Sequence, residues 1–451
     1  MSTDGAKKAL RYRWFIFGSL ATGYLFVYFH RLSPAIVAVE LMNSFRTGGT
    51  VLGILSSAYF YPYAIMQLPA GLLSDSLGPR KIVTIFLVVA CIGAVLFGLS
   101  PNIGTAIVAR FLVGFGVSMI FIPTMKILAE WFLPKEFSFM TGVLIAVGGI
   151  GTLAAATPLA LLTKWLGWRM SFIITGIISL ILALFAGIFV RNRPKDMGLP
   201  SISQIDNTTA ATPSINIRLW DGIKQVLTNK DFWPLAIWFF CDGGIFFTFG
   251  GLWGAPYLMQ VYGLTKAEAG YILNMLSAGM IIGSPILSLL SDKVFMSRKV
   301  VLVGSTIVTV AVTAVLTFFT EHLNLPLLYF LCLLLGIFTS SIVNIAFTST
   351  KELFPKEIAG TSTGTVNIFP FAGGAVFQPL LGYILEKFGK VGETFTPQAY
   401  SAAFGCLFAA AVVSLIAILF MKETIDTSEL RSNEREARLY GRTRTVSEVR
   451  N

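Results

Sequence analysis

The feature that most constrains this chain is its series of twelve long apolar runs, each separated from the next by a polar segment. The hydrocarbon core of a bilayer requires about 20 apolar residues per helix. A helix also satisfies its own backbone hydrogen bonds in lipid. The sequence therefore predicts twelve transmembrane helices, at residues 14–36, 50–73, 82–100, 105–127, 138–162, 169–190, 232–259, 268–290, 299–319, 325–349, 360–385 and 398–421.

The composition agrees with a chain that lies mostly in lipid. Only 13% of the residues are charged, whereas soluble domains carry about 25%. This shortfall excludes an ordinary soluble domain and a disordered chain. The net charge of +11 would favour a nucleic-acid partner in a soluble protein. Here it indicates basic cytoplasmic loops, so no nucleic-acid partner is expected.

The basic residues lie mostly on one side of the predicted spans. If the N-terminus is inside, the cytoplasmic segments hold 26 of the 34 Lys and Arg residues, and the external loops hold six. Basic residues concentrate in the cytoplasmic loops of membrane proteins. We therefore expect a multi-pass protein of the bacterial inner membrane with both termini in the cytoplasm.

The chain divides into two halves at its longest polar segment between spans. That segment contains SISQIDNTTAATPS, a composition typical of a linker. The predicted parts are a cytoplasmic N-terminus (1–13), an N-terminal six-helix bundle (14–190), a cytoplasmic linker (191–231), a C-terminal six-helix bundle (232–421) and a charged cytoplasmic tail (422–451).

The two halves repeat one another in sequence. GLLSDSLGPRK at 71–81 corresponds to SLLSDKVFMSRK at 288–299, and EWFLPKEFSFMTG at 130–142 corresponds to ELFPKEIAGTSTG at 352–364. Their acidic residues are 217 and 221 positions apart, so two separate features repeat at nearly one offset. This predicts an all-α membrane protein of two pseudo-symmetric six-helix bundles with a cavity between them.

The segment between spans 2 and 3 resembles the loop signature of the major facilitator superfamily, and the segment VARFLVG at 108–114 resembles that superfamily's helix 4 motif. The resemblance covers residues 14–421 and implies two halves that rock to give alternating access. It also implies a gate, although the same loop can be read as a basic segment that fixes topology. The gating candidates are Gly71, Asp75, Gly78, Arg80 and Lys81, and in the second copy Asp292 and Arg298.

Ionisable residues inside a membrane are costly and therefore mark candidate functional positions. Arg31 lies about 25 Å along the first predicted helix, counted from Trp14 at about 1.5 Å per residue. Tyr24 and Tyr28 share its helical face. A guanidinium flanked by phenol hydroxyls suits a carboxylate, sulfonate or phosphate. The alternative is that Arg31 reaches out to the external surface.

Further candidates for substrate binding lie on helices 2, 4 and 8. Tyr59, Tyr63 and Gln67 are spaced by four residues on helix 2, where they either line a cavity or fill gaps between helices. Lys126, late in helix 4, either attracts anions to the cytoplasmic mouth or marks the helix end. Asn274 on helix 8 offers a neutral hydrogen-bonding group or a contact between helices.

Two residues are candidates for proton coupling. Asp242 is a carboxylate well inside helix 7, and a buried carboxylate suits a proton carrier. Its alternative is a carboxylate satisfied by a hydroxyl or by cytoplasmic water. The adjacent Gly243 and Gly244 are expected to let the helix bend. Arg110 on helix 4 serves either the substrate, the coupling ion or a structural contact with backbone.

Two families within the superfamily are similar to this chain, the organophosphate:phosphate antiporters and the anion:cation symporters. Arg31, Tyr63 and Lys126 match the helix 1 arginine, the helix 2 tyrosine and the basic position late in helix 4 of the antiporters. Arg31 and Arg110 match the helix 1 and helix 4 arginines of the symporters. Phe247 stands where the antiporters have a second phosphate-binding arginine. A doubly charged phosphate in a cavity of low dielectric constant requires more than one cation. A singly charged carboxylate or sulfonate is therefore favoured.

The sequence thus predicts a monomeric secondary active transporter of small organic anions that works by proton symport. The alternatives are an organophosphate:phosphate exchanger, a proton-driven efflux pump for drugs or siderophores, and a sensor without transport activity. Four cysteines in apolar runs and two histidines do not form a metal-binding pattern. No nucleophile–base pair or phosphate-binding loop is present, so neither a cofactor nor enzymatic activity is expected.

Overall fold

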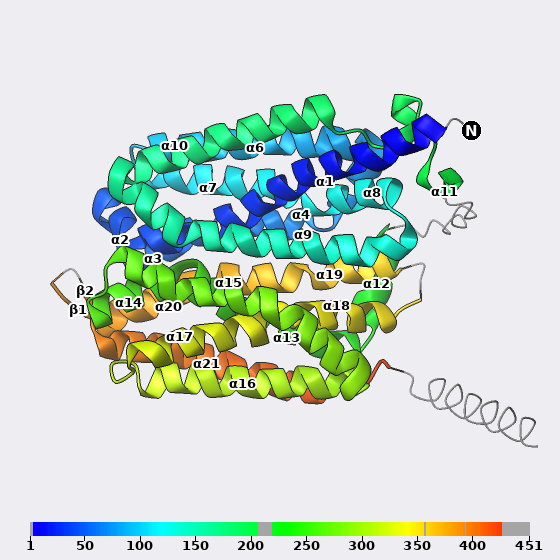
Figure 1. Cartoon of the computed structure of the whole chain (residues 1–451). Helices are drawn as coiled ribbons and strands as arrows, with labels where there is room; N and C mark the ends of the chain where they lie inside the picture. Colours follow the sequence, from blue (N-terminus) through cyan, green and yellow to red (C-terminus); the bar gives the residue numbers. More distant parts are fainter. Residues whose placement is uncertain (1–2, 206–218, 356–357, 393, 426–451) are drawn as a thin grey trace, which may run out of the picture.

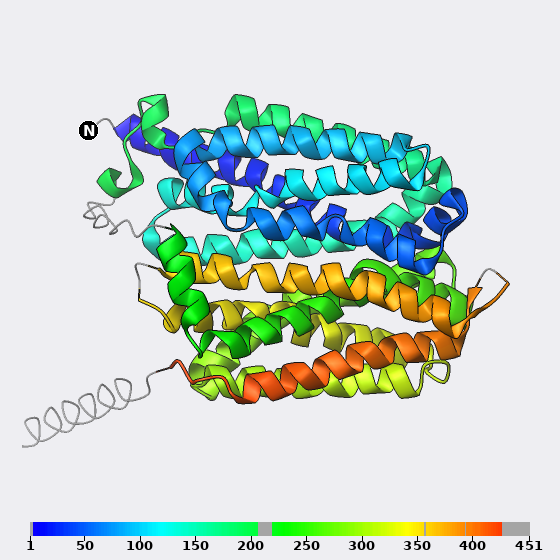
Figure 2. The same ribbon diagram turned by 180° about the vertical axis from the view of Figure 1, so that it is seen from behind.

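The computed structural model describes residues 3–205, 219–355, 358–392 and 394–425, which form an almost entirely helical molecule. The two halves of the chain form two bundles that lie side by side (Figures 1 and 2). Both described chain ends lie at one end of the molecule, here called the termini end. The opposite end carries a short β-hairpin and is called the hairpin end. Parts of the predicted linker (206–218) and tail (426–451) lie outside the described residues.

The N-terminal half consists of α1 (Thr3–Leu32), α2 (Pro34–Phe45), α3 (Gly49–Ser57), α4 (Phe60–Met66), α5 (Pro69–Leu77), α6 (Pro79–Leu99), α7 (Ile103–Ser118), α8 (Phe121–Trp131), α9 (Pro134–Ala155) and α10 (Thr157–Phe189). The segment between the halves contains η1 (Pro194–Met197), α11 (Ile202–Ile205) and α12 (Leu219–Thr228).

The C-terminal half consists of α13 (Phe232–Thr248), η2 (Phe249–Trp253), α14 (Gly254–Tyr262), α15 (Lys266–Leu289), η3 (Leu290–Val294), α16 (Arg298–Phe318), α17 (Leu325–Leu335), η4 (Gly336–Ser341), α18 (Val343–Glu352), α19 (Ala359–Val366), α20 (Ile368–Phe388), β1 (Lys390–Val391), β2 (Thr394–Phe395) and α21 (Pro397–Leu419). The segments η2, η3 and η4 are π-helical turns within helices of this half.

Proline divides several of the predicted spans into shorter helices. Pro34 begins α2, and the helices α1 and α2 meet at 45°. The predicted span 50–73 is divided into α3, α4 and α5, since Pro62 and Pro69 each lack the N–H that would continue the helical hydrogen bonds. Spans 138–162 and 169–190 fall in one helical run, Phe139–Phe189, with a turn at Gly167, where φ is 74°.

Among the described residues, nine helices are long and apolar enough to cross a membrane, or ten if the bent pair α1–α2 is one span. The run Phe139–Phe189 is one of these nine although it contains 51 residues and covers two predicted spans. The segments α3, α4 and α5 are too short to qualify individually. The helical membrane fold is therefore confirmed, and the number twelve stays a prediction.

The two halves pack closely at the hairpin end along α3 and α20. A Cβ atom on Gly49 would lie 3.0 Å from the carbonyl oxygen of Gly382, and one on Gly53 would lie 2.6 Å from that of Gln378. The hydroxyl of Thr50, beside these glycines, donates a hydrogen bond to Glu386. Glycine on α3 therefore allows the backbones of the two halves to approach more closely than any side chain permits.

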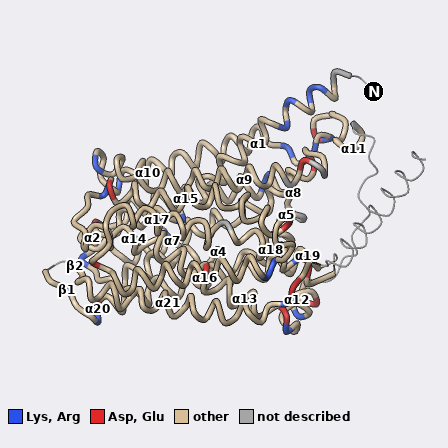
Figure 3. The backbone as a smooth tube through the Cα atoms, turned by 60° about the horizontal axis from the view of Figure 1, so that its bottom comes forward, with Lys and Arg blue, Asp and Glu red and all other residues tan. Residues whose placement is uncertain are grey.

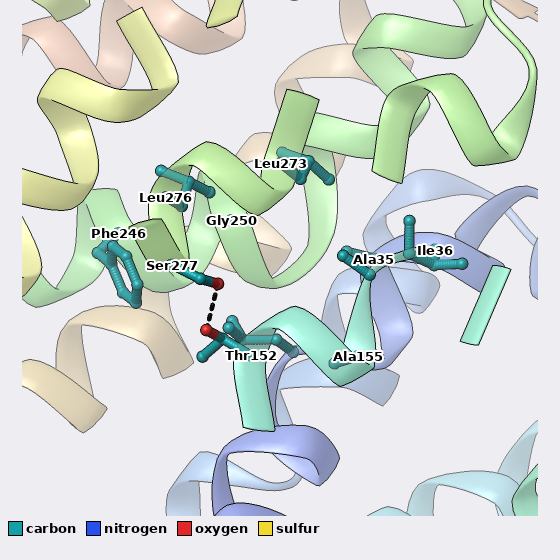
Figure 4. A pocket seen from close by; sticks show the side chains of 11 residues that line it. Ala35, Ile36, Thr152, Ala155, Phe246, Gly250, Leu273, Leu276 and Ser277 are labelled. Atoms are coloured by element: carbon teal, nitrogen blue, oxygen red, sulfur yellow. Dashed lines mark hydrogen bonds between the residues drawn. The ribbon is translucent and has the colours of Figure 1, made fainter. Parts of the chain in front are cut away.

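Polar contacts join the halves along a second seam, between α9–α10 and α15. Lys266 pairs with Glu40 in α2 and donates a 3.2 Å hydrogen bond to Thr163. Deeper in the molecule, the hydroxyls of Thr152 and Ser277 bond to one another, and Figure 4 shows them pointing together across the gap between α9 and α15. The hairpin end is thus closed by contacts between the halves.

The small cavity beside this hydroxyl pair measures about 20 Å³. A cavity of roughly 10–15 Å³ or more holds a single water molecule, so this space is too small for an organic solute. Apolar side chains line most of it, including Ala35 and Ile36 from α2 and Leu273 and Leu276 from α15 (Figure 4). It is therefore a packing void within the closed seam.

At the termini end the C-terminal half is fastened by Glu423, which follows α21. Its carboxylate accepts hydrogen bonds from the Ser297 hydroxyl and from the backbone N–H groups of Arg298 (3.0 Å) and Lys299 (3.2 Å). These N–H groups belong to the first turn of α16 and have no partner within the helix. Burial raises the pKa of Glu423, but these hydrogen bonds outweigh it and hold the pKa below its usual value.

Candidate functional site

Arg31 lies at the interface of the two halves and is enclosed by aromatic rings. The side chain comes from the last turn of α1 and is 4% exposed. Its guanidinium carbon lies within 5.4 Å of four ring centroids, two from each half: Tyr28 (4.6 Å), Tyr63 (4.8 Å), Phe371 (5.0 Å) and Phe247 (5.4 Å). These four rings are called the aromatic cage. The burial of Arg31 excludes the alternative in which it reaches the external surface.

The charge of Arg31 is not neutralised within the cage. Among the described residues, Arg31 forms no ion pair, and its buried Nε atom has no hydrogen-bond partner. Aromatic faces attract a cation, but they cannot replace a counter-ion. A buried cation is stable when it is paired. The arrangement can therefore accept an anion that enters between the two halves.

The C-terminal wall of the cage is held in place by Gln378 on α20. Its side-chain Nε2 donates a 2.8 Å hydrogen bond to the Phe247 carbonyl, and its backbone carbonyl accepts a 3.0 Å hydrogen bond from the Trp253 indole N–H. Phe247 and Trp253 lie just before and at the end of the π-helical segment η2. Phe247 and Phe371 stack with their ring centroids 5.6 Å apart and an interplanar angle of 13°.

The tyrosines and the glutamine predicted on helices 1 and 2 have separate roles. Tyr63 belongs to the cage, whereas the Tyr59 hydroxyl donates a 3.2 Å hydrogen bond to the backbone of Val27. The Tyr24 ring packs against the Tyr28 ring with their centroids 5.4 Å apart, and Tyr24 is not one of the four rings of the cage. Gln67 accepts a 2.9 Å hydrogen bond from Asn367 on the other half. Gln67 therefore joins the halves on the side of the cage nearer the termini end.

Arg110 is buried but does not face the cage. Its Nη1 donates a 3.0 Å hydrogen bond to the carbonyl of His30, and its guanidinium lies 5.2 Å from the Tyr59 ring centroid. His30 in turn lies 3.3 Å from the Ser179 hydroxyl through Nε2. Arg110 thus fixes the backbone next to Arg31, which corresponds to the structural alternative for this residue. Its Nε and Nη2 atoms have no partner among the described residues.

Asp242 lies in the middle of α13 and is 2% exposed. Its Oδ2 atom has no hydrogen-bond partner among the described residues. The expected bend at Gly243 and Gly244 is wrong, because α13 continues as a regular helix to Thr248. A Cβ on Gly243 would lie 2.5 Å from the Cα of Pro370, so this glycine allows α13 to pack against α20.

Lys126 and Asn274 lie outside the cage. Lys126 on α8 donates a 2.7 Å hydrogen bond to the carbonyl of Gly71, which links helix 4 to the loop motif. Asn274 donates a 2.9 Å hydrogen bond to Thr157 and belongs to the polar seam between α10 and α15. Both residues therefore make interhelical contacts in this conformation.

The loop motifs each contact their own half. Gly78 adopts a φ of 84°, and the Arg80 side chain donates a 3.1 Å hydrogen bond to the Gly187 carbonyl in the same half. Arg298 pairs with Asp292 and with Glu352 at 3.2 Å, all within the C-terminal half. Lys81 is exposed, and the Asp75 side chain lies outside the described part of the chain. The ion pairs of Asp292 and Arg298 thus lie within the C-terminal half, and the gating role of these loops stays a prediction.

Phe247 and Phe371 are functional candidates that the sequence did not assign to the site. Phe371 is one of 38 phenylalanines, so composition gives no reason to single it out. The sequence marks Phe247 only as the residue that stands where the antiporter family has a basic group. Among the described residues no group of three or more His, Cys, Asp or Glu side chains could hold a metal ion.

Two membrane-embedded helical bundles that enclose an unneutralised cation at their interface define a multi-pass membrane transporter. The chain belongs to the Major Facilitator Superfamily, whose family model matches residues 16–369 and 240–448.

Several transporters are similar to it in sequence. A probable sulfoacetate transporter of Cupriavidus necator is 23% identical over 95% of this chain and 98% of that protein. The glycerol-3-phosphate transporter of Bacillus subtilis is 25% identical, with coverage of 86% and 89%. The hexuronate transporter of Escherichia coli K12 is 24% identical, with coverage of 84% and 88%.

Two solved structures are similar to it in fold. A bacterial homologue of the human lysosomal transporter Spinster, in an inward-facing and unoccupied conformation, superimposes with a TM-score of 0.69 at 18% identity, covering 91% of this chain and 96% of that chain. A nucleoside transporter superimposes with a TM-score of 0.70 at 14% identity, with coverage of 89% and 99%. These likenesses show the fold of the chain.

Proposed function

We propose that the protein transports small organic anions of the carboxylate or sulfonate type, by proton symport and alternating access. The observation that carries this proposal is the unneutralised Arg31, buried among rings from both halves. An anion that pairs with Arg31 contacts both halves at once, so its binding can drive their relative movement. The relatives named for sulfoacetate and hexuronate transport support the same chemistry.

The cage favours a singly charged group over a phosphate ester. Arg31 is the cation of the cage, and the wall contributed by the other half consists of Phe247 and Phe371. A second negative charge would lie in the low-dielectric interior without a partner, at a substantial cost. Phosphate esters remain the second candidate, since relatives named for glycerol-3-phosphate and hexose phosphate transport also cover most of the chain.

Asp242 is the proposed protonation site. It is buried within the half that does not contain Arg31, and its Oδ2 is free to gain a proton or a partner during the cycle. The sequence contains no nucleotide-binding motif, so an ion gradient supplies the energy. The proposed location is the bacterial inner membrane, with the termini end in the cytoplasm, and the distribution of basic residues supports this orientation.

The test is binding and transport by the purified, reconstituted protein. Arg31→Gln should weaken binding of a carboxylate or sulfonate by roughly 30- to 4,000-fold, because removal of one partner of a buried charge pair costs about 2–5 kcal/mol. Arg193→Gln is the matched control, since this arginine is largely exposed and lies outside the cage. Thermal-shift screening of carboxylates, sulfonates and phosphate esters identifies the class. Stabilisation by phosphate esters alone would favour the second candidate, and stabilisation by bulky cations alone would refute anion transport.

A further inference from the structure

A second cavity, remote from the aromatic cage, lies at the termini end between the first turns of α1 and the last turn of α10. Its volume is about 620 Å³, and it is lined by Lys7, Lys8, Arg11, Tyr12, Phe15 and Phe189. These six residues are called the basic pocket. Figure 3 shows the start of α1 projecting beyond the neighbouring helices, with Lys and Arg positions along it. The proposed transport mechanism does not use this pocket.

The three cations of the basic pocket have no counter-ion within the described parts of the chain. Lys7, Lys8 and Arg11 are exposed, and among the described residues their side chains make no ion pair or hydrogen bond. Arg13, two residues further along α1, differs because it forms a 2.8 Å ion pair with Glu136. The pocket therefore concentrates three positive charges that an external anion can neutralise.

The floor of the basic pocket is rigidly attached to the bundle. The Tyr12 hydroxyl donates a 2.6 Å hydrogen bond to the carbonyl of Phe189. The Phe15 ring lies 5.4 Å from the Phe189 ring and 5.3 Å from the Phe185 ring. These contacts hold α1 against α10, so the cations above them stand on a fixed apolar and aromatic surface.

The depth of the pocket corresponds to the headgroup layer of a membrane. Trp14 is 52% exposed on α1, which forms a candidate membrane span together with α2, and Trp and Tyr gather at the membrane–water boundary. Lys7 to Arg11 precede Trp14 by three to seven residues, or about 4–11 Å along the helix axis. The headgroup layer extends roughly 5–8 Å on each side of the hydrocarbon core. The cations therefore lie at the level of lipid phosphates.

We propose that the basic pocket binds the headgroup of an anionic phospholipid in the leaflet at the termini end. The phosphodiester and the net negative headgroup complement Lys7, Lys8 and Arg11. The acyl chains continue along the partly exposed rings of Phe15 and Phe189, which a soluble phosphate would leave uncovered. The bound lipid links α1, which carries Arg31, to α10 on the cytoplasmic face.

The test is native mass spectrometry of the delipidated full-length protein, titrated with phosphatidylglycerol or with phosphatidylcholine of the same chain length. We expect retention of phosphatidylglycerol, and at least a tenfold loss of retention in the variant Lys7→Gln, Lys8→Gln, Arg11→Gln. The matched control, Lys195→Gln, Lys224→Gln, Lys230→Gln, removes the same charge from exposed positions at the same end. It should retain the lipid as the wild type does.

A charge-conserving variant separates binding from effects on folding or insertion. Lys7→Arg, Lys8→Arg, Arg11→Lys should retain phosphatidylglycerol within about threefold of the wild type. An equal loss in the matched control, or equal retention of phosphatidylcholine, would overturn the assignment to this pocket. Competition by millimolar inorganic phosphate would show that the occupant is a soluble anion and would refute the lipid.

Discussion

The ion pair between Lys266 and Glu40 should set the balance between closed and open states at the hairpin end. These side chains are 19% and 33% exposed, so the pair is partly shielded from water. Exposed pairs contribute about 0.2–1 kcal/mol, and removal of one partner of a fully buried pair costs about 3–5 kcal/mol. An intermediate value of about 1.5 kcal/mol is expected for Glu40→Gln, which is roughly a tenfold change in the ratio of the two states.

The assay is a distance measurement across the hairpin end. Spin labels at Thr47→Cys and Val391→Cys report on the two halves, because Thr47 precedes α3 and Val391 lies in the exposed hairpin. Glu40→Gln should increase the fraction of molecules with the longer distance about tenfold at equilibrium. Lys387→Gln removes a positive charge from an exposed position at the same end and should leave the distance distribution unchanged.

A double-mutant cycle completes this test. If the pair acts as described, Glu40→Gln and Lys266→Gln together should shift the distribution by less than the sum of their separate effects. Additive effects, or a distribution in Glu40→Gln identical to that of the wild type, would refute a role for this pair in closing the hairpin end.

Three further predictions concern other residues. Asp242→Asn should abolish proton-driven accumulation in proteoliposomes yet preserve counterflow exchange, and normal accumulation would exclude it as the protonation site. Gly53→Ala should destabilise the closed hairpin end by about 1–3 kcal/mol, since its Cβ would meet the backbone of α20. The same spin labels should report this opening. Gly18→Ala is the control and should cause no opening, because a Cβ at Gly18 has open space around it. The lowered pKa of Glu423 means that its contribution to stability is present above the unfolded-state pKa of about 4.3 and is lost as the pH falls through the folded-state pKa. Thermal unfolding between pH 3 and 6 should show this loss in the wild type and a flatter profile in Glu423→Gln.

The sequence predicts the membrane fold well because the apolar runs report directly on burial in lipid. It predicts the internal structure of those runs less well. The span 50–73 is divided at Pro62 and Pro69, and the position of such a break depends on how neighbouring helices accept the freed carbonyl groups. The helix was expected to bend at Gly243 and Gly244, but these glycines accommodate α20 instead.

The site shows the same division between local and long-range information. Arg31 and Tyr28 are three residues apart on one helix, so their proximity follows from helical geometry. Phe247 and Phe371 come from the other half, and their approach to Arg31 depends on the docking of two bundles. Periodicity within a helix contains no information on that docking, and phenylalanine is too common in this chain to attract notice.

The attachment of Phe247 to Gln378 has a consequence for how this protein accommodates solutes of different width. The Gln378 side chain on α20 donates to the Phe247 carbonyl, and the Gln378 backbone carbonyl accepts from the Trp253 indole, so this one residue contacts both sides of the π-helical turn η2. The width of the space beside the Arg31 guanidinium is therefore controlled from a neighbouring helix. A substitution at Gln378 can change which solutes fit there without altering any ring of the aromatic cage or the charge of Arg31.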